Sequence, residues 1–89
     1  MLENSILLKN KTNSLPNSVG VYLFLDKKNS VIYIGKSVNI KKRVVSYFKN
    51  ISKKTQKLIQ STHNINHIIV DSEKDALFLE NNLIKKHKP

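Results

Sequence analysis

The sequence predicts a small α/β (α+β) domain, in which helices pack on a three-stranded antiparallel sheet. Two short apolar runs, 21–25 and 31–34, flank a polar loop, which is typical of a β-hairpin. Two later stretches, 39–48 and 73–86, carry apolar residues at helical spacing. The chain has 89 residues, which is one domain with a core that buries only about 60–65% of the unfolded surface.

The elements can be assigned in chain order. Residues 1–14 form a polar leader with an apolar patch at 6–8, for which we expect a short helix or a strap across the core. A turn-like Leu-Pro-Asn-Ser run at 15–18 ends the leader, and the hairpin follows. The remaining predicted elements are a helix at 39–48 capped by Asn39 or Ser37, a weaker helix at 53–62, a strand at 65–70, and a helix from a capping-box-like run at 72–75 to about residue 86.

The charge of the chain indicates a polyanionic partner. Sixteen Lys and Arg residues oppose six Asp and Glu residues, for a net charge of +10, and nucleic acid is the partner that such an excess favours. Arg43 is the only arginine. Its planar guanidinium can grip a phosphate in two places, which an ammonium cannot do.

Composition also excludes several classes of protein. The chain has no cysteine, so disulfides, thiolate zinc sites and cysteine nucleophiles are excluded. No apolar run is long enough for a membrane span, and residues 1–14 do not resemble a signal peptide. We therefore expect a cytoplasmic protein with no membrane partner.

Two triplets contain both glycines and two of the three tyrosines of the chain. Gly20-Val21-Tyr22 and Tyr33-Ile34-Gly35 lie in the two strands of the predicted hairpin, which brings Tyr22 and Tyr33 close together. In a chain with so few glycines, we expect each to stand where a Cβ would be in the way. As large aromatics in core strands, the tyrosines also fit a purely structural role.

Glu80 is the most informative single residue. On a helical wheel, Ala76, Leu77, Leu83 and Ile84 all lie within about 60° of Glu80, which predicts that Glu80 is at the middle of the apolar face of the last helix. Burying an unpaired carboxylate costs at least several kcal/mol. Two explanations remain open: a structural ion pair with Arg43 or a lysine, or a hard divalent cation completed by water and substrate phosphate.

These features together resemble the GIY-YIG endonuclease family, with Val21 in place of Ile in the first triplet. Within it, the chain is most similar to the N-terminal nuclease domain of the bacterial excision-repair protein UvrC. The resemblance runs from Leu15 to Pro89. The matching positions are 15–22, 33–36, Asn39, 41–44, 46–48, Lys54-Thr55, 71–73, Ala76-Leu77 and the 79–86 segment.

The resemblance implies a domain at 15–89 that hydrolyses a DNA phosphodiester bond 3′ of a lesion in nucleotide excision repair. It implies one divalent cation, Mg²⁺ or Mn²⁺, held by Glu80. The implied partners are damaged double-stranded DNA and UvrB, and the isolated domain should be monomeric. Because the family has an active-site asparagine shortly after the position of Pro89, we expect the N-terminal fragment of a larger protein.

The resemblance also implies individual roles. Tyr22 and Tyr33 would jointly activate water, with Tyr33 favoured, although a free phenol with a pKa near 10 would need about 4 kcal/mol of stabilisation to ionise at neutral pH. The other implied roles are a phosphate clamp for Arg43, a phosphate or hydroxyl contact for Lys36, an added hydroxyl for Tyr47, close backbone approach at Gly20 and Gly35, and DNA-backbone contacts for Lys36, Lys41, Lys42 and Arg43.

Two alternatives remain. A stand-alone or mobile-element GIY-YIG endonuclease would need an attached domain that reads DNA sequence, and we see none in this chain. A non-catalytic DNA-binding module on the same scaffold is the other alternative. It would have no use for a carboxylate in an apolar stripe, and its affinity would depend on salt but not on divalent metal.

Overall fold

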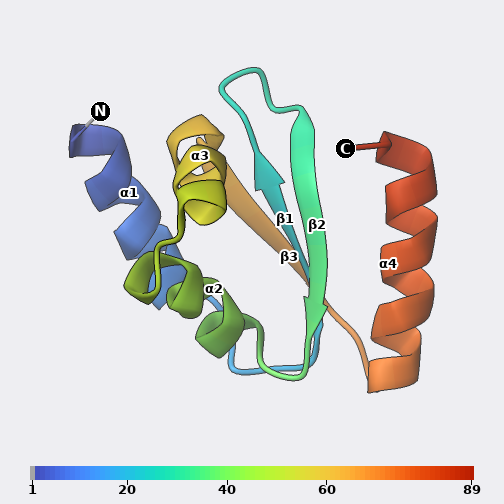
Figure 1. Cartoon of the computed structure of the whole chain (residues 1–89). Coiled ribbons are helices and arrows are strands. Elements are labelled where there is room, and N and C mark those ends of the chain that lie inside the picture. The colour runs from blue at the N-terminus through green and yellow to red at the C-terminus, as the bar shows by residue number, and fades with distance from the viewer. Residues whose placement is uncertain (1) are drawn as a thin grey trace.

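The computed structural model describes residues 2–89, with side chains from residue 8 onward. This part of the chain forms four helices and three strands (Figure 1). They are α1 (Leu2–Asn13), β1 (Gly20–Leu25), β2 (Val31–Ser37), α2 (Ile40–Lys49), α3 (Lys53–Ser61), β3 (Asn64–Ile69) and α4 (Glu73–His87).

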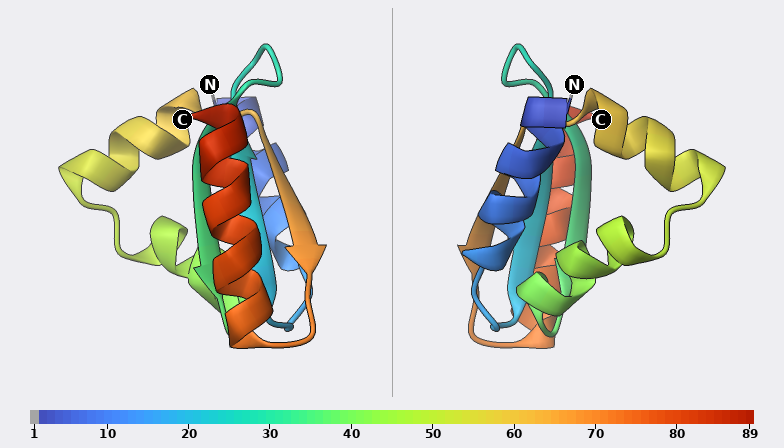
Figure 2. Two further views of the ribbon diagram at one scale, coloured as in Figure 1. Left: turned by 90° about the vertical axis from the view of Figure 1, so that its right-hand side faces the viewer. Right: turned by 90° about the vertical axis from the view of Figure 1, so that its left-hand side faces the viewer.

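The three strands form one antiparallel sheet in the order β2-β1-β3. Helices α1, α2 and α3 lie on one face of this sheet and α4 covers the other (Figures 1 and 2). The register places Tyr22 opposite Gly35 and Phe24 opposite Tyr33. Since directly opposed residues point to the same face, Tyr22, Phe24 and Tyr33 all point toward α2.

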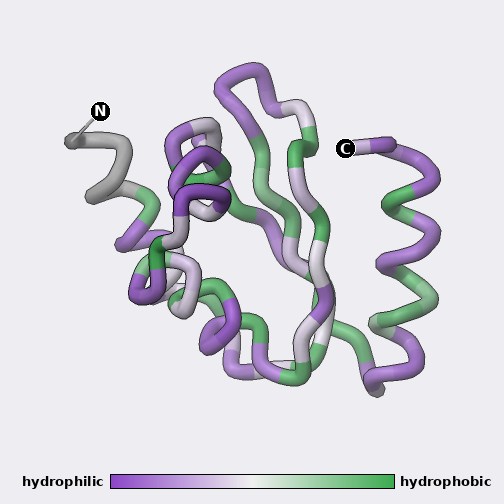
Figure 3. Tube along the Cα trace, viewed as in Figure 1, coloured by the Kyte–Doolittle hydropathy of each residue, from purple (hydrophilic) through white to green (hydrophobic). Residues whose placement is uncertain are grey.

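The central strand separates two apolar cores. All six residues of β1 are buried, because α1 and α2 cover one face and α4 covers the other. Figure 3 shows hydrophobic segments along the strands and a hydrophilic hairpin loop. The core toward α1 and α2 includes Tyr22, Phe24, Ile40, Val44 and others, and the core toward α4 includes Val21, Leu23, Leu25, Ile34 and Ala76.

The predicted fold class is confirmed, and the predicted caps lie where the sequence indicated. The Asn39 side chain accepts from the backbone N–H of Lys42, and the Ser72 side chain accepts from that of Asp75. The third strand begins at Asn64, one residue earlier than predicted.

The N-terminal segment forms a helix, which was one of the two predicted outcomes. Leu8 and Thr12 of α1 are buried, and α1 packs against α2 and β3. The predicted apolar patch at 6–8 lies partly outside the described side chains, since those of Ile6 and Leu7 are not among them.

The predicted apolar face of the last helix was partly wrong. Ala76 is buried and Leu83 is half-buried against the sheet, but Leu77 and Ile84 are 46% and 40% exposed. The short side chain of Ala76 lets α4 approach the sheet on the side that also carries Leu79. Glu80 therefore lies at the margin of the buried face, half-buried, and not at its centre.

Candidate active site

Three tyrosine hydroxyls, from β1, β2 and α2, meet in one hydrogen-bonded cluster. The hydroxyls of Tyr22 and Tyr47 are 2.9 Å apart, and Tyr47 donates to the hydroxyl of Tyr33 across 3.3 Å. We call Tyr22, Tyr33 and Tyr47 the tyrosine cluster. The structure thus brings together all three tyrosines that the sequence analysis selected as candidate site residues.

Aromatic packing fixes the positions of these rings. Phe24 contacts Tyr33 and Tyr47, with ring centroids 5.9 and 5.5 Å apart. The rings of Tyr33 and Tyr47 are nearly perpendicular, at 75°, which is a favourable edge-to-face arrangement. Tyr22 is 1% exposed, whereas Tyr33 and Tyr47 are half-buried, so the cluster opens toward solvent through the last two.

Gly35 makes room for the ring of Tyr22. A Cβ at Gly35 would overlap Cζ and the hydroxyl oxygen of Tyr22, which lies directly across the β1–β2 pair. A Cβ at Gly20 would instead overlap the backbone oxygen of Ile68 and come within 2.8 Å of Cδ1 of Ile40. Both glycines stand where a Cβ would be in the way, as predicted, but only Gly35 adjoins the tyrosine cluster.

Arg43 extends the cluster on its solvent side. Its guanidinium interacts with the hydroxyl of Tyr22 and lies 5.3 Å from the ring centroid of Tyr47, within cation–π distance. Arg43 is on the exposed side of α2, so the rest of its donor fork is free to reach an anion. The interactions of Arg43 are thus with tyrosine side chains, and not with Glu80, which was one of the two kinds of ion pair that the sequence allowed.

The tyrosine hydroxyls hold their protons more tightly than free phenols. Burial is the main factor that raises the pKa values of Tyr22 and Tyr47. The pKa of Tyr33 is raised by its hydrogen bond with Tyr47, then by burial. Arg43 acts against the increase in each case. Ionising any of the three at neutral pH therefore costs more than the 4 kcal/mol expected for a free phenol.

The tyrosine cluster opens into a groove between α2 and α3. The groove has a volume of about 350 Å³. Its lining residues are Tyr33, Arg43, Tyr47, Lys54, Thr55 and Leu58. The last three come from α3. Lys54 and Thr55 are among the positions that match the family, but no role beside the tyrosines was predicted for them or for Leu58, although their spacing of one and three positions puts them on one side of a helix.

Glu80 approaches the cluster from the other side of the sheet. Its negative charge acts on the hydroxyl of Tyr33 and helps to raise the pKa of that group. Tyr33 lies on β2, which is an edge strand, so the carboxylate of α4 and the phenol influence each other around the sheet edge. In the described part of the chain, no three His, Asp or Glu side chains gather into a metal-binding group. A single carboxylate suits a hard cation that keeps most of its waters, so Glu80 fits one divalent ion.

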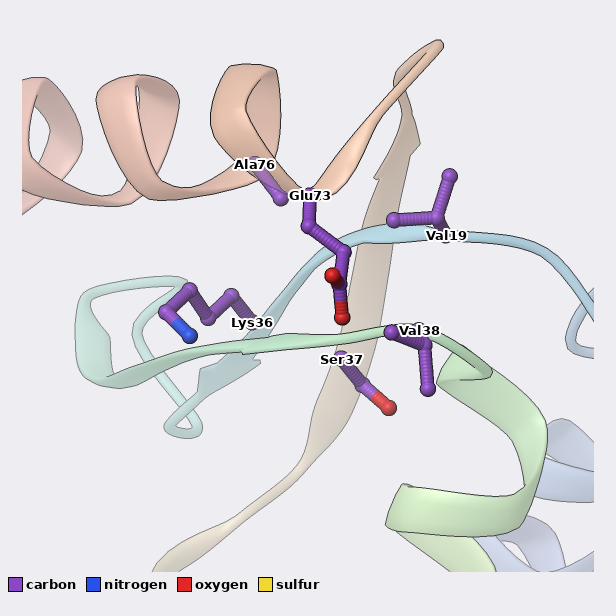
Figure 4. Close-up of a pocket in the computed structure, with 6 residues that line it drawn as sticks. All are labelled: Val19, Lys36, Ser37, Val38, Glu73 and Ala76. Atoms are coloured by element: carbon purple, nitrogen blue, oxygen red, sulfur yellow. The ribbon is translucent and has the colours of Figure 1, made fainter.

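Lys36 lies on the face of the sheet opposite the tyrosine cluster. It is three residues beyond Tyr33 on β2, and side chains alternate along a strand. It is exposed and lines a water-sized hollow of about 30 Å³ under the first turn of α4, beside Ser37 and Glu73 (Figure 4). The structure therefore does not bring Lys36 into the hydroxyl cluster.

Lys41 and Lys42 lie on the outer side of α2. Together with Lys49, they line a hollow of about 400 Å³ that is separate from the groove of the tyrosine cluster. This hollow and the groove both border α2, and both are lined by positively charged side chains. The surface around α2 is thus basic on more than one side.

Comparison with known proteins identifies the family. Residues 18–89 match the family model for the UvrC-like GIY-YIG domain. The chain is 51% identical over 83 residues to UvrABC system protein C of Mycoplasma capricolum and 46% identical over 90 residues to that of Bacteroides fragilis. These matches cover 92% and 99% of this chain, but only 14% and 15% of those relatives.

Solved structures agree with this assignment. The GIY-YIG N-terminal endonuclease domain of UvrC from Thermotoga maritima, bound to its catalytic magnesium, matches with a TM-score of 0.86 and 34% identity over 93% of this chain and 92% of that one. Further structures of the same domain carry point mutations and a bound catalytic divalent cation. No helix within residues 2–89 is long and apolar enough to cross a membrane. This chain belongs to the UvrC-like GIY-YIG family of endonuclease domains.

Proposed function

We propose that the chain is a divalent-metal-dependent endonuclease domain that hydrolyses a DNA phosphodiester bond 3′ of a lesion in nucleotide excision repair. The observation that carries the proposal is the joining of three tyrosine hydroxyls and Arg43 in one open cluster, with the carboxylate of Glu80 acting on Tyr33. Phosphodiester hydrolysis needs groups of these types, namely an oriented water, a phosphate clamp and a charge-stabilising cation.

Arg43 is suited to clamp the scissile phosphate. Its side chain is exposed, yet its guanidinium lies over the ring of Tyr47 and interacts with the hydroxyl of Tyr22. A fork held in this way loses little freedom when it donates two hydrogen bonds to a phosphate.

Tyr33 orients the attacking water in this proposal, and Tyr22 and Tyr47 support it. Because the pKa values of all three are raised, the free domain holds neutral phenols at neutral pH. Tyr33 is the more exposed tyrosine of the β-hairpin pair and hydrogen-bonds Tyr47. A cation bound nearby would favour the ionised phenol and so oppose the raised pKa of Tyr33.

Glu80 would hold the divalent cation, Mg²⁺ or Mn²⁺. Bound there, the cation would neutralise developing charge on the phosphate. The fit rests on a half-buried carboxylate of α4 whose charge acts on Tyr33.

The wider basic surface would bind DNA without reading its sequence. Lys41 and Lys42 on α2 and the exposed Lys36 on β2 are placed to contact phosphates beyond the scissile one. Damaged duplex DNA is the substrate and UvrB the partner in this proposal, which also has the domain monomeric and cytoplasmic. Lesion specificity would be supplied by the other parts of full-length proteins such as these relatives.

Divalent-metal binding tests the proposal directly. Mn²⁺ should bind the wild-type chain, and Glu80→Gln should abolish this binding because it removes the charge but keeps the shape. Glu73→Gln is the matched control, since Glu73 is an exposed carboxylate in the first turn of the same helix. Calorimetry measures Mn²⁺ binding by the wild type and by both variants. Equal Mn²⁺ binding in wild type and Glu80→Gln, or DNA cleavage unaffected by chelator, would refute the assignment of Glu80.

A further inference from the structure

The groove beside the tyrosine cluster has an α3 wall that the proposed chemistry does not use. Lys54, Thr55 and Leu58 of α3 face Arg43 and the two half-buried tyrosines across about 350 Å³. Ligand sites in proteins start at about 300 Å³, so this groove has room for a small ligand. The grooves of a DNA duplex are about 6–12 Å wide. The whole duplex is wider than its grooves, so it would not fit inside this protein groove.

The lining of the groove combines an apolar floor with a cationic rim. Leu58 and the rings of Tyr33 and Tyr47 provide the apolar surface, and each is half-buried. Arg43 and Lys54 provide positive charge from α2 and α3. A ligand that matches both parts carries an anionic group and a flat or apolar body, as one nucleotide does.

Thr55 adds a directed donor to this rim. Its backbone N–H and its Oγ1 are both engaged with the Oγ of Ser52, from which Oγ1 accepts a hydrogen bond of 3.0 Å. Its hydroxyl hydrogen therefore remains for a ligand oxygen.

Lys54 differs from its neighbours on the helix. Lys53, Lys54 and Lys57 are all exposed on α3, but of these three only Lys54 lines the groove. Diffuse attraction of DNA by a chain of charge +10 would use the three lysines alike. A built subsite would depend on Lys54 in particular.

We infer that the groove binds a single nucleotide of the cleaved DNA strand, next to the scissile phosphate. Lys54 and Thr55 contact its phosphate, and Leu58 with the tyrosine rings packs against its sugar or base. The wall of α3 is thus a positioning element that sets the strand against Arg43 and Tyr33. This inference rests on the proposed nuclease function and assigns the part of the substrate that the site holds.

The test compares binding of a labelled single-stranded oligothymidylate by wild type, Lys54→Gln and Lys53→Gln, followed by fluorescence anisotropy. Lys54→Gln should raise the dissociation constant about tenfold at low salt, as loss of a hydrogen bond between charged groups does. It should also make the salt dependence less steep by about 0.7, the value for one contact to a single strand. Lys53→Gln should change both values much less, and Lys54→Arg should restore binding.

The outcomes separate this inference from the proposed function. If wild type binds the oligonucleotide and cleaves DNA with Mg²⁺, but Lys54→Gln and Lys53→Gln weaken binding equally, the groove is overturned and the nuclease proposal stands. If wild type neither binds nor cleaves, the proposed function fails and the groove inference fails with it. A rise in KM with kcat nearly unchanged in Lys54→Gln supports a positioning role, because a fold defect would lower both activity and stability.

Discussion

Replacing Gly35 by alanine tests how the tyrosine cluster is built. The added Cβ would overlap the end of the Tyr22 ring, which is 1% exposed and cannot move aside into solvent. The backbone itself accepts alanine, because none of the glycines has a positive φ. The whole effect of the substitution should therefore come from the contact between residues 35 and 22.

The expected cost follows from three contributions. Overpacking costs about 1–3 kcal/mol, and loss of the hydrogen bond between Tyr22 and Tyr47 adds about 1 kcal/mol. The lower freedom of alanine in the unfolded chain offsets about 0.4–1 kcal/mol. Gly35→Ala should thus lower the free energy of unfolding by about 1–4 kcal/mol, a large part of the stability of a domain this small.

A double-mutant cycle isolates the contact. Leucine at position 22 keeps apolar volume but lacks the atoms that a Cβ at position 35 would overlap. In a Tyr22→Leu background, Gly35→Ala should therefore be neutral or stabilise the fold by up to about 1 kcal/mol. Urea unfolding followed by far-ultraviolet circular dichroism gives the four free energies.

Gly20→Ala is the matched control for this cycle. The nearest atoms that its Cβ would meet belong to Ile68 and Ile40 and not to Tyr22, so its cost should be nearly the same in both backgrounds. If Gly35→Ala also costs the same in both backgrounds, the contact with Tyr22 does not explain the glycine and the reasoning is refuted.

Two further predictions concern charge. Arg43→Lys should lower the cleavage rate on the order of 10²-fold with little loss of stability, because lysine keeps the charge but not the fork held by Tyr22 and Tyr47; Lys42→Arg is the control, and equal effects would contradict the assigned role. Stability should stay constant up to about pH 10 and fall above it, because unfolded phenols ionise near 10 while the tyrosine cluster, with its raised pKa values, keeps its protons. Urea unfolding midpoints at pH 9 and pH 11 measure this fall in stability. Loss of lysine charge at high pH would act in the opposite direction. A higher midpoint at pH 11 than at pH 9 would contradict the prediction.

Most of the fold could be predicted from local sequence patterns. The short apolar runs, the period-3.6 patterns and the polar residues Asn39 and Ser72 mark most helix and strand ends within one or two residues, although β2 continues to Ser37, beyond the predicted 31–34. The pairing of β3 with the far edge of β1 was not predictable in this way, because it joins residues such as Gly20 and Ile69 that are far apart in sequence.

The candidate site was predicted in part, and each difference has a physical reason. Tyr22, Tyr33 and Tyr47 meet because the hairpin and α2 bring them to one face. Lys36 was assigned by resemblance to the same network, although strand alternation puts it on the opposite face from Tyr33. The position of Glu80 depended on how closely α4 approaches the sheet at Ala76, which a helical wheel does not contain.

The tyrosine cluster makes the chain a reporter of its own site. The chain has three tyrosines and no tryptophan, and all three tyrosines belong to the cluster. Its near-ultraviolet absorption and its intrinsic fluorescence therefore arise almost entirely from groups at the candidate active site. Binding of a cation or a nucleotide can be followed there on the unmodified protein, without a label and without background from the rest of the fold.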